Sequence, residues 1–281
     1  MRSHAASRPG LRLGPLAVRV VSGGLLLAVV FGLILLGIWG IWAVVVALLG
    51  VALWEFRRLS DQIGFRAPSW LLFPLAFYLA FSGTLLQAVP LELVLAVALT
   101  VGLSVFLFIP GRRAGLGRWA MGVAGAIYLG LPMNYYLLLY TRANPGRGLA
   151  WLLLTIGTAV VSDAAAMLVG QRLGRHPFFA SVSPRKTVEG AVAGVLLCVP
   201  VTVAGGFYFL GLQPWQAVVL GLLVGVSAEA GDLVESQMKR LAGIKDSSHI
   251  IPGHGGVLDR LDSLLFPPIV VYLFAFYLHL L

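Results

Sequence analysis

The sequence predicts an all-α membrane protein with several spanning helices, and its composition is the first observation behind this. Hydrophobic residues make up 59% of the 281 positions and charged residues only 11%, against roughly a quarter in a soluble domain. A soluble chain of this size could not bury so much apolar surface, which indicates that lipid surrounds it. The second observation is that the apolar residues form runs close to the length of about 20 residues that a spanning helix needs.

Nine apolar segments follow one another along the chain. The first, 16–36, comes after arginines as in a signal peptide, but it contains no small-residue cleavage site, so we interpret it as a retained span. The other segments lie at 38–54, 69–87, 91–109, 119–139, 148–169, 189–211, 214–233 and 263–281. No internal repeat or low-complexity linker separates them. We therefore expect one continuous membrane domain, with about five spans in 1–150 and about four in 151–281.

Basic residues are distributed unevenly among the connections between these spans. With nine spans, 18 of the 20 Lys and Arg residues fall on one side of the membrane, and only Arg142 and Arg147 fall on the other. The positive-inside rule then predicts that the N-terminus lies on the cytoplasmic side of the inner membrane. The net charge of +9 is explained by this topology and by phosphate-bearing partners. Aromatic and basic residues do not alternate, so nucleic acid is not an expected partner.

Two connections on the predicted cytoplasmic side are long and polar, at about 170–188 and 234–262. We expect any chemistry there, because a water-soluble substrate can reach these loops. Disulfides and cysteine-based metal sites are excluded, because the single cysteine, Cys198, lies inside an apolar run.

Several acidic residues stand at or near membrane depth. They are Asp163, Glu229, Asp232 and Glu235. A carboxylate inside a bilayer costs roughly 2.5–3.5 kcal/mol. Two interpretations are open: the helices simply end at the interface, or the acids line a polar cavity and bind cations.

The segment 231–240 has helical spacing. Asp232, Ser236 and the pair Lys239 and Arg240 lie at i, i+4 and i+7/i+8, which places them on one face. An acid followed by bases on one face suits an assembly of metal ion and phosphates. A solvated helix end whose bases complement the dipole is the alternative.

A dense group of polar residues follows this segment. It contains Lys245, Asp246, Pro252, Gly253, His254, Gly255, Gly256, Asp259, Arg260, Asp262 and Ser263. The glycines let backbone N–H groups approach an anion, because no Cβ obstructs it. A helix starting after them would place Asp259, Asp262 and Ser263 on one face, and paired carboxylates with phosphate oxygens are how Mg²⁺ is usually held. His254 is a candidate for binding or proton transfer.

The segment 183–190 supplies a third element. We interpret Ser183 as a helix N-cap followed by proline at the first helical position. Arg185 and Lys186 would then lie in the first turn, where the helix dipole disfavours cations unless an anion is bound there. The alternative is that both bases only anchor the loop on the cytoplasmic side.

These residues resemble the motifs of a known family. The 27 positions from Ser236 to Asp262 resemble the signature of phosphatidate cytidylyltransferases, also called CDP-diacylglycerol synthases. The segment 183–190 resembles the family's second motif, and Asp163 with Gly170 and Arg172 resembles its third. Three departures occur, namely Met167 at a position usually held by tyrosine, Gln171 between Gly170 and Arg172, and the additional acid Glu229.

The resemblance implies that CTP and phosphatidic acid react to give CDP-diacylglycerol and pyrophosphate, with Mg²⁺ in what is expected to be a two-metal site. It implies Asp232 and Asp259 as principal metal ligands and Asp246 and Asp163 as secondary ones. The catalytic group would be Asp232, Asp259, Lys239 and Asp246. Substrate binding would fall to Ser183, Arg185, Lys186, Ser236, Arg240, Lys245, His254, Gly255, Gly256, Arg260 and Asp262.

Other functions and partners stay open from the sequence. A CTP-dependent lipid kinase would transfer the γ-phosphoryl group and release CDP, and a transporter would use the acids as coupling sites. Use of dCTP beside CTP is also open. A homodimer is expected from the family resemblance and from small-residue pairs such as Gly190/Gly194 and Gly221/Gly225.

Overall fold

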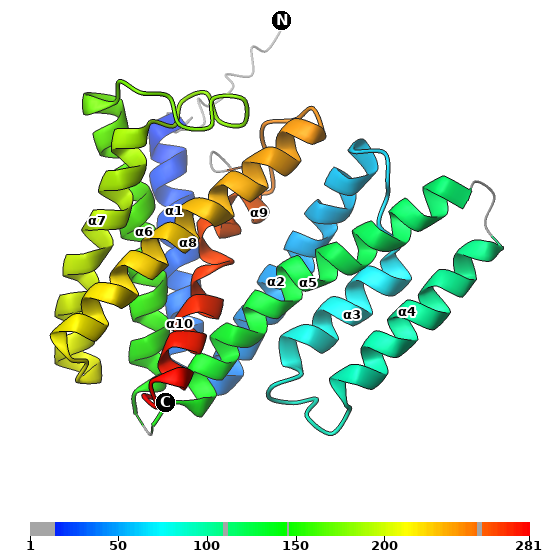
Figure 1. Cartoon of the computed structure of the whole chain (residues 1–281), viewed down its shortest axis with the longest axis horizontal. Helices are drawn as coiled ribbons and strands as arrows, with labels where there is room; N and C mark the ends of the chain where they lie inside the picture. The colour runs from blue at the N-terminus through cyan, green and yellow to red at the C-terminus, as the bar shows by residue number, and fades with distance from the viewer. Residues whose placement is uncertain (1–14, 109–111, 145, 252–254) are drawn as a thin grey trace, which may run out of the picture.

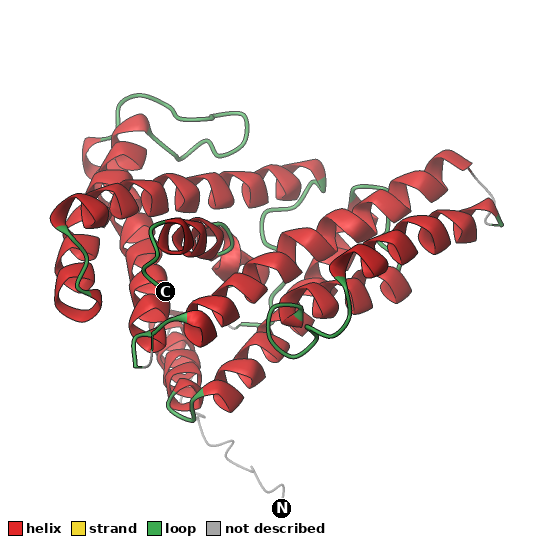
Figure 2. Ribbon diagram, turned by 60° about the horizontal axis from the view of Figure 1, so that its bottom comes forward, coloured by secondary structure: helices red, strands yellow, loops and turns green. Residues whose placement is uncertain are grey.

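The computed structural model describes residues 15–108, 112–144, 146–251 and 255–281. These residues form a bundle of helices joined by loops (Figures 1 and 2). Within these ranges there is no β-strand, and only two isolated bridges occur, Pro177 with Thr187 and Ile251 with Gly255. The predicted all-α class is therefore confirmed.

Each of the nine predicted apolar segments corresponds to one helix or one interrupted helix. The helices are α1 (Pro15–Ile34), α2 (Ile38–Gln62), α3 (Ser69–Phe81), α4 (Leu91–Leu107), α5 (Arg112–Arg142), α6 (Gly148–Leu173), α7 (Val188–Gly205) with the π-helix η1 (Gly206–Leu210), α8 (Pro214–Leu241), α9 (Leu258–Leu261) with the 3-10 turn η2 (Asp262–Leu264), and α10 (Pro267–Tyr277). Six segments are long and apolar enough to cross a membrane, while α3, α4 and the searched part of α1 are shorter. The chain is thus a polytopic membrane protein, and the count of nine spans stays a prediction.

Several predicted spans have wrong ends: α5 and α6 are longer than predicted, α3 ends at Phe81 rather than near 87, and α2 and α8 extend furthest at their C-terminal ends. α2 continues to Gln62 rather than ending near 54, and α8 continues to Leu241 rather than ending near 233. In both cases the segment beyond the predicted end contains an acid, Glu55 or Glu235, that is fully buried among other parts of the chain. A polar residue in an apolar run therefore marks a protein contact here, and not the end of the helix.

The polar connections gather at one edge of the bundle. Residues 63–68, 174–187 and 242–251 all lie at the upper edge in Figure 1, while 35–37, 82–90 and 211–213 lie at the lower edge. These three connections, which all carry basic residues, therefore share an edge, because alternate connections between spans lie on the same side. Which side of a membrane this edge faces stays a prediction.

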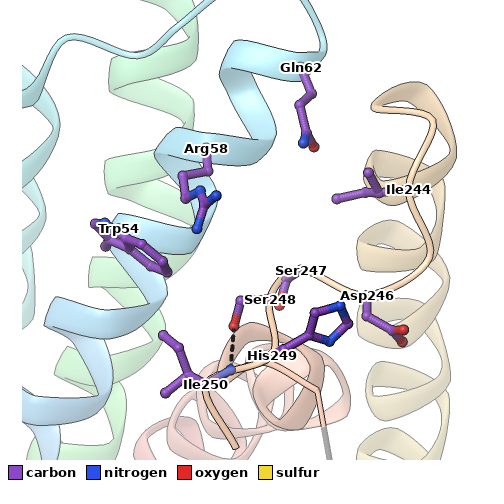
Figure 3. Close-up of a pocket in the computed structure, with 9 residues that line it drawn as sticks. All are labelled: Trp54, Arg58, Gln62, Ile244, Asp246, Ser247, Ser248, His249 and Ile250. Atoms are coloured by element: carbon purple, nitrogen blue, oxygen red, sulfur yellow. Dashed lines mark hydrogen bonds between the residues drawn. The ribbon is translucent and has the colours of Figure 1, made fainter.

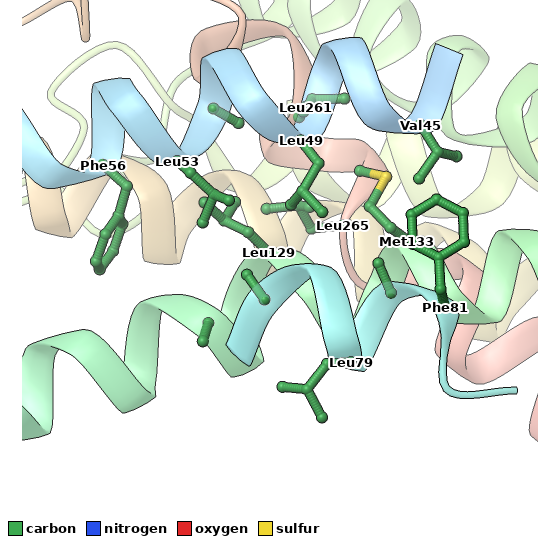
Figure 4. Close-up of a cluster of buried hydrophobic side chains, with 14 of the residues drawn as sticks. Val45, Leu49, Leu53, Phe56, Leu79, Phe81, Leu129, Met133, Leu261 and Leu265 are labelled. Carbon is green, nitrogen blue, oxygen red and sulfur yellow. The ribbon is translucent and has the colours of Figure 1, made fainter. Parts of the chain in front are cut away.

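The largest buried cluster joins α2, α3 and α5 with the start of the C-terminal segment (Figure 4). Val45, Leu49, Leu53 and Phe56 lie along one face of α2 at helical spacing, and each is 5% exposed or less. They pack with residues such as Leu129 on α5. This packing fixes the position of α2, and hence of Glu55, against the C-terminal segment.

Small residues bring α6, α7 and α8 close together. A Cβ on Gly190 would collide with the backbone of Ala166 on α6, and a Cβ on Gly221 would collide with the backbone of Val199 on α7. Thr202 Oγ1 also donates a hydrogen bond of 2.7 Å from α7 to the carbonyl of Ala217 on α8. These glycines serve contacts within the chain, and the homodimer stays a prediction.

The predicted start of α7 at Ser183 is wrong. α7 begins at Val188, and Thr187 is its N-cap, with Oγ1 accepting a hydrogen bond of 3.2 Å from the Gly190 N–H. Ser183 instead lies in a turn, where its carbonyl accepts from the Lys186 N–H. Arg185 and Lys186 therefore precede the helix.

Replacing Thr187 by Ala is expected to lower stability by about 1 kcal/mol, or about 2 °C in melting temperature, because the cap is lost. Thermal unfolding of the detergent-solubilised protein measures this. Thr187→Ser keeps the oxygen and should stay close to the wild type, as should Thr100→Ala on the exposed side of α4. A Thr187→Ala variant that melts with the wild type contradicts the assignment of the cap.

Candidate active site

Charged side chains from distant parts of the chain meet near the C-terminal half of α8. Its predicted polar face is confirmed by a hydrogen bond of 3.2 Å from Ser236 Oγ to Asp232 Oδ1, one helical turn apart. Two lysines, Lys186 and Lys239, each join carboxylates there. We call the two groups the Lys186 cluster and the Lys239 cluster.

The Lys186 cluster consists of Lys186, Glu229, Asp232, Asp163 and Ser263. Lys186 Nζ lies 2.6 Å from Glu229 Oε2 and 2.7 Å from Asp232 Oδ2. In the 3-10 turn η2, Ser263 Oγ donates a hydrogen bond of 2.5 Å to Asp163 Oδ2 on α6. The 174–187 loop, α6, α8 and η2 therefore each contribute a side chain to one site.

Lys186 is charged in this setting. Burial alone would lower its pKa, but the adjacent carboxylates of Asp232 and Glu229 outweigh that effect and raise the pKa above its usual value. The ammonium group thus keeps its proton across the neutral range. It offsets part of the negative charge of the two acids on α8.

The Lys239 cluster consists of Lys239, Glu235, Asp259, Ser247 and Glu55. Lys239 Nζ lies 2.5 Å from Glu235 Oε2 and 2.8 Å from Asp259 Oδ1. Asp259 Oδ2 accepts hydrogen bonds of 2.9 Å from the Ser247 N–H, the Ser247 hydroxyl and the Gly256 N–H. Asp259 therefore ties the loop after α8 to the start of α9.

Glu55 is a member of the site that the sequence interpretation missed. It is fully buried, and its carboxylate accepts from the hydroxyls of Ser247 (3.2 Å) and Ser248 (2.5 Å) and from the N–H groups of Val257 (3.0 Å) and Leu258 (2.6 Å). The one signal in the sequence was an acid directly after the apolar run of the second segment, 38–54. Glu55 joins the N-terminal half of the chain to the signature segment.

The glycine-rich turn serves the protein's own carboxylates. Gly255 has a φ of +83°, in the region that favours glycine. A Cβ on Gly256 would collide with Ser247 Oγ and the Glu55 carboxylate. The N–H groups of the glycine segment were expected to approach a substrate anion, but the Gly256 N–H donates to Asp259, and the next N–H, that of Val257, donates to Glu55. Pro252, Gly253 and His254 lie outside the described residues.

Replacing Gly256 by Ala is expected to lower activity at least about 10-fold and stability by about 1–3 kcal/mol, because the added methyl group has no room. Gly157 on α6 has open space around it, so Gly157→Ala is the matched control and should leave both unchanged. Thermal unfolding together with turnover measures the two effects. Wild-type behaviour of Gly256→Ala would contradict the close approach of Glu55 and Ser247.

Carboxylates outnumber bases in the two clusters and beside them. Asp163, Glu229, Asp232, Glu235, Asp259 and Asp262 are buried or half-buried, whereas Lys186 and Lys239 are the bases that contact these acids in the described part of the chain. Asp262 lies within electrostatic range of Asp163 and Asp232. Buried charges need partners. The excess of acid oxygens therefore fits a bound cation.

The donor set also fits a hard cation such as Mg²⁺. Among the described residues, no group of three or more His, Cys, Asp or Glu side chains forms a preassembled metal shell. Mg²⁺ usually takes only one or two protein carboxylates and completes its coordination with phosphates and water. Asp232, Asp163 and Asp262 supply oxygens of the required kind.

The structure places the other predicted site residues as follows. Arg240 Nε donates to the Val182 carbonyl at 3.1 Å and so ties α8 to the 174–187 loop. Arg185, Lys245 and Arg260 are exposed. Asp246 is not part of either cluster but lines a separate pocket beside α2 (Figure 3).

An apolar cavity of about 500 Å³ ends at the acidic residues. Its walls come from α1, α2 and α6, with Val30, Val44 and Ile156 among the lining residues. Asp163, Asp259, Arg260, Asp262 and Ser263 line its polar end. The site therefore has an apolar side and a charged side.

The fold and the site together define a polytopic helical membrane protein in which buried acids and lysines meet at the end of an apolar cavity. Comparison with known proteins places it further: the chain belongs to the cytidylyltransferase family, whose model matches residues 17–278.

Individual relatives carry a more specific name. The chain is 34% identical to a phosphatidate cytidylyltransferase of Mycobacterium bovis over 161 residues, which are 55% of this chain and 51% of the relative. It is 40% identical to that of Synechocystis over 168 residues (58% and 55%) and 43% identical to that of Helicobacter pylori over 133 residues (46% and 47%). The chain thus spans about half the length of the curated relatives it matches.

Proposed function

We propose that this protein transfers the cytidylyl group of CTP to phosphatidic acid, giving CDP-diacylglycerol and pyrophosphate. The observation that carries the proposal is the junction of an apolar cavity with two lysine–carboxylate clusters. Such a junction suits one substrate with acyl chains and a phosphate head, and another that is a soluble triphosphate. The family membership and the names of the relatives support the same reaction.

The reaction needs no covalent intermediate on the protein. An oxygen of the lipid phosphate attacks the α-phosphorus of CTP, a new P–O bond forms, and the bond to the β-phosphate oxygen breaks as pyrophosphate leaves with the electron pair. The protein then acts by positioning the two phosphates and by stabilising charge. Lys186 and Lys239 are placed to stabilise the negative charge that develops on the leaving group.

Mg²⁺ belongs to this proposal, with Asp232 as the first ligand and Asp163 and Asp262 beside it. When bound, the ion supplies positive charge to the phosphate oxygens of both substrates. Asp259 and Asp246 were predicted as ligands too. Asp259 already accepts from Ser247 and Gly256 and pairs with Lys239, and Asp246 lies in the separate pocket. Their contacts favour a supporting role for Asp259 and a binding role for Asp246.

The orientation and assembly are part of the same proposal. The edge that carries the 174–187 and 242–251 connections lies on the cytoplasmic side of the inner membrane, and CTP reaches the site from the cytoplasm. The phosphatidate acyl chains lie in the apolar cavity between α1, α2 and α6. The protein works as a homodimer, and dCTP is a second nucleotide to test beside CTP.

The test supplies purified protein with CTP labelled at either the α- or the γ-phosphate and with phosphatidic acid or, in a parallel reaction, a lipid alcohol. Transfer of the α-label into lipid, dependent on Mg²⁺ and with no transfer of the γ-label, is the expected result. Transfer of the γ-label to a lipid alcohol would instead identify a CTP-dependent kinase. Well-folded protein that moves neither label would contradict the proposal.

A further inference from the structure

A second polar pocket lies between the last turns of α2 and the 244–250 segment (Figure 3). It has a volume of about 420 Å³. Trp54, Arg58 and Gln62 line it from α2, and Asp246 and His249 line it from the loop. Neither the lysine clusters nor the apolar cavity accounts for these side chains.

The pocket combines flat surfaces with hydrogen-bonding groups. The Arg58 guanidinium carbon lies 4.7 Å from the centre of the Trp54 ring, so an aromatic plane and a cationic plane form one wall. Bases of nucleotides stack on such side chains. Asp246 and Gln62 provide acceptors for amino and hydroxyl groups, and Gln62 also provides donors. This is the chemistry that recognises a nucleoside.

The charge of the pocket distinguishes a nucleoside from a phosphate. A phosphate group, whether from a lipid or from a nucleotide, would be attracted by Arg58 but repelled by the carboxylate of Asp246, which lines the same pocket from the loop. An amino group on a base or the hydroxyls of a ribose carry no charge, so Asp246 and Gln62 can accept hydrogen bonds from them without electrostatic repulsion. The observations therefore favour the uncharged part of a nucleotide.

The pocket shares a wall with the Lys239 cluster. Ser247 lines the pocket, and it also donates to Asp259 and to Glu55. Glu55 follows Trp54 directly on α2 and accepts a hydrogen bond from the Val257 N–H of the signature segment. A nucleotide whose base lies beside Trp54 can therefore extend its phosphates toward the ammonium group of Lys239.

We propose that the pocket formed by Trp54, Arg58, Gln62, Asp246 and His249 binds the cytosine and ribose of the nucleotide substrate. This inference rests on the proposed function, because it takes a cytidine nucleotide as the ligand. It assigns nucleotide specificity to α2, in the half of the chain outside the signature motif. The phosphate contacts remain with the lysine clusters.

The test compares two ligands that share phosphates but differ in the nucleoside. The probes are α,β-methylene-CTP, which cannot be cleaved at the reacting bond, and inorganic tripolyphosphate. Binding of each to the purified protein is measured for the wild type, Trp54→Ala, Trp54→Phe and Trp39→Ala. Trp39 is the matched control, because it is an exposed tryptophan at the other end of α2.

Trp54→Ala is expected to weaken binding of α,β-methylene-CTP about tenfold or more, within the range of base stacking on an aromatic side chain. Tripolyphosphate binding should change less than about twofold, because the phosphates are held elsewhere. Trp54→Phe should stay near the wild type, as should Trp39→Ala.

Three outcomes would overturn the inference. In the first, Trp54→Ala binds both probes as tightly as the wild type does. In the second, the substitution weakens the binding of both probes equally. In the third, turnover of Trp54→Ala shows a higher KM for phosphatidic acid and an unchanged KM for CTP, which would indicate a lipid headgroup site. Failure of the proposed function is distinguishable from these. A wild type that binds α,β-methylene-CTP through Trp54 but forms no CDP-diacylglycerol would retain the pocket and reject the reaction.

Discussion

Replacing Lys186 by Met is expected to lower kcat for cytidylyl transfer about 1,000-fold, because the site loses a fixed positive charge where negative charge develops. The same change leaves Glu229 and Asp232 without their cation. Removing one partner of a buried ion pair costs about 3–5 kcal/mol in stability. Turnover and thermal unfolding are therefore measured together.

The double variant Lys186→Met/Glu229→Gln separates the two effects. It removes one positive and one negative charge, so it should recover much of the lost stability but none of the lost activity. Arg66→Met is the matched control, since Arg66 is an exposed base paired with exposed Asp61 at 3.7 Å. Recovery of activity in the double variant would contradict a role for Lys186 at the reacting phosphates.

Replacing Glu55 by Gln is expected to lower stability by about 2–3 kcal/mol, because a charged acceptor of several hydrogen bonds is replaced by a group with one oxygen. The amide nitrogen of Gln would also face one of the two N–H donors, Val257 or Leu258, which donate to different oxygens of Glu55. We expect faster hydrogen exchange over 247–251 and 255–258 and a loss of activity of about 100-fold or more.

Glu92→Gln is the control for this variant, because Glu92 is an exposed acid in the first turn of α4. It should leave exchange and activity unchanged. If Glu55→Gln exchanged and turned over like the wild type, Glu55 would be an incidental neighbour of the signature segment and not its support.

The general architecture could be predicted because lipid imposes long apolar runs. All nine segments appear as helices, and the row of Asp232, Ser236 and Lys239 on α8 follows directly from helical spacing. The ends of α2 and α8 could not be predicted in this way. Glu55 is satisfied by hydrogen bonds from a segment far away in the sequence, and Glu235, fully buried, pairs with Lys239 on the same helix.

Most residues of the site could be named from the sequence, but the contacts between them could not be predicted. Lys186 is separated by more than 40 positions in the sequence from its partners Glu229 and Asp232. Glu55 is separated by more than 200 positions from its partners Val257 and Leu258. Spacing along one helix carries no signal for such contacts. Glu229, which departs from the family pattern, has a physical role here as a partner of Lys186.

The loop before α7 shows how local rules can compete. Ser183 followed by proline has the form of an N-cap, but Thr187 takes that place. Backbone hydrogen bonds from Phe178 to Lys186 and from Val188 to His176 hold the loop in an extended pair up to Thr187. Because α7 begins only at Val188, Lys186 lies in the loop before the helix, and its side chain contacts the acids on α8.

We propose that cytidylyl transfer takes place at Asp232 and Lys186, and a single-turnover experiment on variants of Asp232 can decide this. Transfer of label from α-labelled CTP into phosphatidic acid is followed in a single turnover for the wild type, Asp232→Asn and Asp61→Asn. Asp61 is an exposed acid beyond the site and serves as the matched control. We expect wild-type rates for Asp61→Asn and a rate at least about 1,000-fold lower for folded Asp232→Asn. Transfer by Asp232→Asn at the rate of the wild type would contradict the account.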